Sequence, residues 1–97
     1  MLAAAAKGDA VVVGLILREA KRLQIDRSVI DAKDEQDERT PLMEAAKGGH
    51  LTVVRMLMRE GADTKVRDRH GQTAMHWAAS TTHPAALEIV KTLQLGN

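Results

Sequence analysis

Apolar side chains recur at helical spacing in short stretches, which are separated by polar segments that contain glycine. In residues 51–58 the apolar positions lie three or four residues apart and share one helix face; they are Leu51, Val54, Leu57 and Met58. The preceding stretch opens with Thr40-Pro41, which is typical of a helix start. The threonine hydroxyl can accept a hydrogen bond from a free backbone amide of the first turn. Proline has no backbone N–H, but a residue at the first helical position does not need one. Between the stretches, "KGGH" supplies glycines for a tight reversal. The pattern therefore predicts two short helices, over about 40–47 and 51–60.

This two-helix pattern occurs three times. The stretch "TPLMEAAKGG" at Thr40 is matched thirty-three residues later by "TAMHWAAS" at Thr73, and the helices that follow also match if three residues are inserted around "STTHPA". An earlier copy, "AAAKGDAVVVGLIL", lies over "AAKGGHLTVVRMLM" at an offset of forty-one. One helix pair cannot bury its apolar face alone, whereas stacked pairs shield one another. The repetition predicts a row of helix hairpins.

The segments that connect one helix pair to the next are predicted to project as loops or fingers. "ADTKVRDRHG" has the Asp and Gly chemistry of turns and little apolar periodicity. Asp34, Asp37 and Asp68 are expected to form turns through their own side chains rather than to contact a partner. Five acids against two bases give residues 31–39 a charge of about −3, and three bases against one acid give residues 65–72 about +2. The two fingers should therefore form a dipolar groove.

These residues resemble the ankyrin repeat family, whose unit of about thirty-three residues joins a β-turn finger to two antiparallel helices around a T-P-L-H-x-A core. "DERTPLMEAAKGGHLTVVRMLMREGAD" follows that pattern nearly throughout, with Met43 in place of the usual histidine. "DRHGQTAMHWAAS" restores His76 but has Ala74 in place of proline. The resemblance implies an all-α fold: an ankyrin-repeat α-solenoid of about three repeats, with capping units at both ends.

We expect one domain over residues 1–97, made of an N-terminal capping repeat (1–30), a middle repeat (31–63) and a C-terminal capping repeat (64–97). Polar Thr92 and Gln94 stand where the middle repeat has methionines, as expected of a terminal unit in a small complete stack. The first repeat is followed by extra residues, "AKRLQIDRSVIDA". They could extend the second helix and fold back on the stack, or present a recognition loop, and the sequence leaves both open.

Composition narrows the classes of function. The formal net charge of +1 gives no bulk attraction to nucleic acid or acidic membranes. The absence of cysteine excludes disulfides, thiolate metal sites and a thiol nucleophile, and fits a reducing compartment. The N-terminus lacks the pattern of a secretory signal. These features favour a cytoplasmic or nuclear protein that has no membrane partner.

Histidines are the main candidates for catalysis or metal binding. His76 is expected to bond the Thr73 hydroxyl, His50 is expected to be structural after the inter-helix glycines, and His83 in the "STTHPA" turn could play the equivalent role. Only His70 falls at a finger tip. No histidine pair has the i, i+4 spacing of a zinc site, "KGGH" lacks the spacing of phosphate-binding loops, and the acids of "DAKDEQDE" lack an apolar pocket. We therefore expect no catalytic residue, metal, cofactor or small-molecule substrate.

The resemblance implies that a partner binds finger tips and the concave face of the inner helices. Carried over residue by residue, that surface takes two parts from the fingers and two from the helices: Lys33, Glu35, Gln36 and Arg39; Arg67, Arg69, His70 and Gln72; Glu44, Lys47 and Gly48; and Trp77, Ser80 and Thr81. Trp77 is the best anchor, because aromatic residues dominate interface energetics, although packing between adjacent inner helices explains it as well.

The favoured function is therefore a monomeric, non-catalytic protein-protein interaction module, an adaptor or scaffold. One alternative is a targeting or regulatory module of a larger multidomain enzyme or signalling protein. A less favoured alternative is nucleic-acid binding, which the basic finger "KVRDRH" and the resemblance of short helix pairs to a helix-turn-helix suggest.

Overall fold

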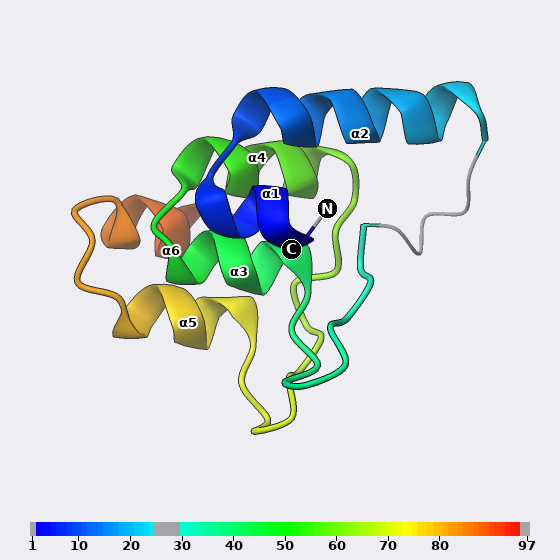
Figure 1. Cartoon of the computed structure of the whole chain (residues 1–97). Coiled ribbons are helices and arrows are strands. Elements are labelled where there is room, and N and C mark those ends of the chain that lie inside the picture. Colours follow the sequence, from blue (N-terminus) through cyan, green and yellow to red (C-terminus); the bar gives the residue numbers. More distant parts are fainter. Residues whose placement is uncertain (1, 25–29, 96–97) are drawn as a thin grey trace.

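A computed structural model of the chain describes residues 2–24 and 30–95. Within these ranges it contains six helices and no strand (Figure 1), which confirms the predicted all-α fold. The helices are α1 (Leu2–Lys7), α2 (Ala10–Arg22), α3 (Pro41–Lys47), α4 (Leu51–Arg59), α5 (Ala74–Ser80) and α6 (Ala86–Leu95).

The helices form three consecutive hairpins, α1 with α2, α3 with α4, and α5 with α6. In the inner row α3 packs against both α1 and α5, and in the outer row α4 packs against both α2 and α6. Two long segments, residues 31–40 and 62–73, leave this stack and project to the same side as fingers (Figure 1). The middle hairpin is thus the only one of the three that has a neighbour on each side.

The helices α3 and α5 begin at the polar residues that the sequence predicts as their caps. The Thr40 hydroxyl accepts a hydrogen bond from the Met43 amide at 3.4 Å, and Pro41 occupies the first turn of α3. At α5 the Thr73 amide donates to His76 Nδ1 at 3.0 Å, and the Thr73 hydroxyl lies 2.8 Å from the same nitrogen. His76 therefore has the structural role expected of it, since it caps its own helix.

The turn that joins the two helices of a hairpin packs against the same turn of the next hairpin, where a histidine lies on a glycine. Gly8 and Gly49 both adopt positive φ, +72° and +74°, so a side chain at either position would strain the backbone. A Cβ atom would also collide with His50 at Gly8 and with His83 at Gly49. His50 Nε2 further bonds the carbonyl oxygen of Ala6 at 2.9 Å. The predicted supporting roles of His50 and His83 are confirmed by these contacts.

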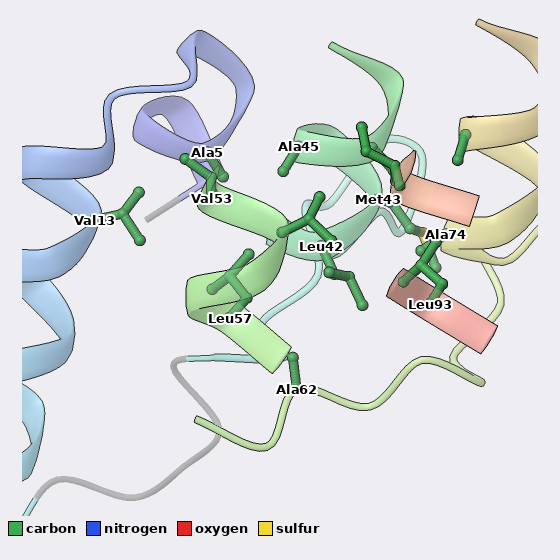
Figure 2. Packing of buried hydrophobic residues seen from close by; sticks show 14 of the residues in the cluster. Ala5, Val13, Leu42, Met43, Ala45, Val53, Leu57, Ala62, Ala74 and Leu93 are labelled. Atoms are coloured by element: carbon green, nitrogen blue, oxygen red, sulfur yellow. The ribbon is translucent and has the colours of Figure 1, made fainter. Parts of the chain in front are cut away.

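The core is a single apolar layer between the two rows of helices. Figure 2 shows side chains from successive hairpins meeting there, and Leu42, Leu57 and Leu93 are all fully buried. Small residues such as Ala45 and Ala78 let the inner helices lie close together. The core is continuous along the stack because each hairpin covers the apolar side of the next.

The extra residues of the first repeat extend its second helix in part. α2 has 13 residues whereas α4 has 9, and it ends at Arg22. Leu23 is 57 % exposed and does not fold back on the stack, whereas Ile30 is only 7 % exposed and joins the core. Ile25 and Val29, which the sequence places in the same segment, lie outside the described residues.

Shortening a core leucine should destabilise the fold far more than shortening an exposed one. We predict that Leu57→Ala lowers the free energy of unfolding by about 2 to 5 kcal/mol, because it leaves a cavity between α4 and its neighbours. The matched control Leu87→Ala, at a leucine that is 64 % exposed on α6, should change it by no more than about 0.5 kcal/mol. Urea denaturation measures both. Equal losses would contradict the proposed core.

Candidate functional site: the paired fingers and the inner helices

The two fingers are bonded to each other and form one surface. The Lys33 ammonium donates to the Arg67 carbonyl oxygen at 3.2 Å. The backbone amide of Arg69 donates to the Asp37 carbonyl oxygen at 2.9 Å, and its guanidinium reaches the Glu35 carbonyl oxygen at 3.3 Å. A fourth bond, from the Asp63 amide to Asp31 Oδ1 at 3.0 Å, also joins the fingers. These bonds fix the position of one finger relative to the other, which a row of independent loops would lack.

An aspartate closes each finger through hydrogen bonds to backbone amides. Asp34 Oδ1 accepts from the amides of Asp37 at 2.8 Å and Arg39 at 3.3 Å. Asp68 Oδ1 accepts from the amides of His70 and Gln72, both at 2.9 Å. The predicted turn-forming roles of Asp34 and Asp68 are confirmed.

The turns differ by one residue. Asp34 bonds the third and fifth residues after it, whereas Asp68 bonds the second and fourth. In both fingers the residue before the last bonded amide lies in the left-handed region, Glu38 at a φ of 58° and Gly71 at 76°, although non-glycine residues such as Glu38 rarely adopt it.

These bonds hold both carboxylates in the ionised form. Backbone amides, first that of Asp37, lower the pKa of Asp34 below its ordinary value even though partial burial opposes them. For Asp68 burial alone would raise the pKa, but donors from Gln72, His70 and Trp77 together outweigh it and lower the pKa. The turns of both fingers therefore depend on a negatively charged aspartate.

Trp77 joins the second finger to the inner helices. Its indole Nε1 donates to Asp68 Oδ2 at 3.1 Å, so one carboxylate both closes the finger and holds the ring. The guanidinium carbon of Arg39 lies 5.1 Å from the ring centroid and the Lys47 ammonium lies 5.5 Å from it, distances typical of cation–π contacts. The ring is half-buried and packs against the core. Trp77 therefore packs between α5 and α3 while part of it faces solvent.

Arg39 is a structural centre of this surface. Its guanidinium pairs with Asp37 at 2.6 Å and with Glu44 at 3.0 Å, and only 18 % of its side chain is exposed. Asp37 was expected to form a turn through its own side chain, but that side chain bonds this guanidinium instead. Arg39 therefore ties the first finger to α3, while the dipole between the fingers stays a prediction, because the charge counted for residues 31–39 already includes Arg39 and Asp37.

The remaining predicted contact residues fall into two groups. The first group lies on the fingers and at the end of α3: Glu35, Gln36, Lys47, Arg67, Arg69 and His70 are exposed, and Gln72 is half-buried. Ser80 and Thr81 lie at the opposite end of α5 from the finger, where Ser80 Oγ donates to the Trp77 carbonyl oxygen at 3.0 Å. We define the finger face as the exposed side chains of the first group together with Trp77.

The bond between Asp68 and Trp77 was not predicted from the sequence, which indicated only a turn at Asp68. The one sequence signal for it is an acid of the second finger nine residues before the only tryptophan. Elsewhere in the described ranges, no cluster of three or more histidine, aspartate or glutamate side chains has metal-binding geometry. No helix described in the structure is long and apolar enough to span a bilayer.

Replacing Asp68 by asparagine should detach Trp77 from the second finger. The asparagine oxygen can serve the two finger amides or the indole, but its amide nitrogen cannot accept, so one set of bonds is lost. We predict a loss of about 1 to 3 kcal/mol in unfolding free energy and a shift in Trp77 fluorescence. Asp9→Asn, which removes the same charge from a helix cap that asparagine also forms, is the control and should change little. A fluorescence spectrum unaltered by Asp68→Asn would contradict the bond.

The two aspartates also predict how stability depends on acidity. Their pKa values are lowered in the folded chain, so their contribution is complete above about pH 5, where both are ionised in the unfolded chain as well. It is lost as the pH falls through the folded values. The melting temperature should thus be level from about pH 7 to 5 and fall below about pH 4, less steeply in Asp68→Asn. An equally steep acid decline in that variant would contradict the assignment.

Comparison with known proteins gives one family. A profile described as "Ankyrin repeats (3 copies)" matches residues 1–96. The human protein "Ankyrin repeat domain-containing protein 63" is 37 % identical over 70 residues, which is 68 % of this chain and 18 % of that protein. The "Apicidin F cluster transcription factor apf2" of Gibberella fujikuroi is 37 % identical over 54 residues, 56 % of this chain and 14 % of that protein.

A third relative, the "Ankyrin repeat and KH domain-containing protein mask-1" of Caenorhabditis elegans, is 41 % identical over 58 residues. These residues are 59 % of this chain and 2 % of that protein. The chain thus matches less than a fifth of the length of each of these relatives. The repeated hairpins, the fingers and the profile that covers nearly every residue lead to one conclusion: the chain belongs to the ankyrin repeat family and contains three repeats.

Proposed function

We propose that this chain is a non-catalytic protein-interaction module that binds its partner through the finger face. Ankyrin repeats are generally protein-interaction modules. The observation that carries the proposal is the restraint of Trp77, which Asp68 holds from one side and Arg39 and Lys47 cover from another. A restrained aromatic ring loses little entropy on binding, and such rings are frequent hot spots of interfaces.

The exposed residues around the ring suit a polar rim. Lys47, Arg69 and His70 are exposed, and each lies on an element that the bonds between the fingers or the stack hold in place. Rim charges mainly set specificity and the rate of association. The partner is accordingly a protein, the chain acts as an adaptor or scaffold without a metal or cofactor, and a cytoplasmic or nuclear location fits the absence of cysteine.

A second function is a targeting or regulatory module within a larger protein. The three relatives favour it, because each is far longer than the part that matches this chain and one also carries a KH domain by name. Detection of this chain inside a longer translated product in its native cell would support that arrangement. Detection of a product of about 10.6 kDa alone would contradict it.

Reversing a charge on the finger face should separate binding from folding. We predict that Lys47→Glu weakens capture of the native partner from cell extract roughly tenfold or more, because it removes a cation beside Trp77. Lys91→Glu is the matched control, an equal charge change at an exposed lysine on the outer helix α6. Quantitative mass spectrometry of captured proteins measures both. Equal capture by wild type and Lys47→Glu would contradict the finger face as the binding surface.

A further inference from the structure

The outer helices carry a second surface, which the proposed function does not use. α2, α4 and the adjoining Glu60 contain five cations and two acids, a charge of +3, whereas the whole chain carries +1. The rest of the chain therefore sums to −2. Both acids are already paired, Glu19 with Arg22 at 2.9 Å and Glu60 with Lys21 at 3.3 Å. Positive charge is thus concentrated on the side of the molecule opposite the inner helices.

Three arginines of this surface are exposed and have no carboxylate partner in the described part of the chain: Arg18, Arg55 and Arg59. Arg55 and Arg59 are four residues apart, so they lie on one face of α4. Guanidinium groups that are unpaired and exposed bind carboxylates well, because their planar donors match both oxygens.

A hollow of about 370 Å³ lies between α2 and α4, beside these arginines. Its apolar lining comes from Leu17, Met56 and the bare backbone of Gly14, and Arg18, Lys21, Arg59 and Glu60 line its remaining sides. In the repeat alignment Gly14 takes the place that Arg55 has on α4, and its missing side chain lets Met56 approach α2. The helices approach closely there, since a Cβ at Gly14 would lie 3.1 Å from Met56 Cε.

A second hollow of about 460 Å³ lies on the other flank of α4, toward α6. Met58, Leu95 and Thr92 line it together with Arg55 and Arg59. Arg59 therefore lines both hollows and stands between them. Each hollow has a methionine in its lining, and a methionine side chain adapts its shape to different apolar groups.

We propose that this outer surface docks an acidic segment of a partner protein, with carboxylates on Arg59 and its neighbouring arginines and apolar side chains in the flanking hollows. We name the lining residues of the two hollows the outer docking surface. The charge selects an anionic partner, and the pair of discrete apolar hollows on either side of one arginine favours a peptide, whose side chains alternate in chemistry residue by residue. A phosphate backbone offers the arginines charge but offers the methionines nothing.

The surface is independent of the finger face. Its residues come from the outer row of helices, and none of them belongs to the fingers or the inner helices. An ankyrin stack with both surfaces can bring two proteins together, which is the physical requirement of a scaffold.

Fluorescence anisotropy with defined peptides tests the proposal. The probe is a labelled dodecapeptide that repeats the order Glu-Leu-Glu-Glu; one control replaces each leucine by serine and another replaces each glutamate by lysine. We expect the leucine-containing acidic peptide to bind, with an affinity that falls as salt rises. The serine peptide should bind at least about fivefold more weakly, and the lysine peptide should not bind.

Two protein variants locate the binding. Arg59→Glu should weaken the acidic peptide roughly tenfold or more, because it reverses the charge that both hollows share. Lys91→Glu, an equal charge change on α6 outside both hollows, should change the affinity less than about twofold. Circular dichroism checks that both variants fold. Lys47→Glu tests the finger face and Arg59→Glu tests the outer docking surface. Loss of partner capture through the finger face therefore does not imply loss of peptide binding at the outer docking surface, or the reverse.

Several results would overturn the proposal. Equal effects of Arg59→Glu and Lys91→Glu would show attraction by overall charge alone. Equal binding of the leucine and serine peptides would show that the hollows play no part. Tighter binding of phosphatidylserine vesicles or duplex DNA than of the acidic peptide, at the same salt concentration, would assign the surface to a membrane or a nucleic acid instead.

Discussion

The fold depends on each hairpin covering an apolar side that its neighbour cannot bury alone. Among the helices of residues 2–24 and 30–95, α3 and α4 alone have a neighbour on both sides in their rows, and Leu42, Val53 and Leu57 between them are fully buried. Burial of apolar surface is the main favourable term in folding, so this hairpin contributes the most to the stack. Both candidate surfaces result from this stacking. The fingers extend from the inner row of helices, and the two hollows flank α4, the outer helix of the middle hairpin.

The fingers add a polar layer to this apolar one. Asp68 accepts from two backbone amides and from the Trp77 indole, and Arg39 pairs with acids of both the first finger and α3. These hydrogen bonds and ion pairs restrain the side chains that make them, although Arg39 Nε is buried without a hydrogen-bond partner in the described part of the chain. The finger face is therefore held in shape before any partner arrives, and its geometry is coupled to the ionisation of two aspartates.

Local signals made most of the fold predictable. The start of α3 at Thr40-Pro41, the glycine turns and the helix cap by His76 each depend on residues close in sequence, and each was predicted. The contact of Arg39 with Trp77 was not predictable, because the two residues belong to different repeats and meet only in the stacked fold. The hollows beside Gly14 and Met58 likewise arise between helices that belong to different repeats.

Native-state hydrogen exchange tests the central claim most directly, because it measures the opening free energy of each helix separately. If the middle hairpin holds the stack together, the amides of α3 and α4 should exchange only through global unfolding. Those of α1 and α6, which have a row neighbour on one side only, should exchange through smaller openings. Exchange of α3 and α4 at rates equal to or faster than those of α1 and α6 would contradict the account.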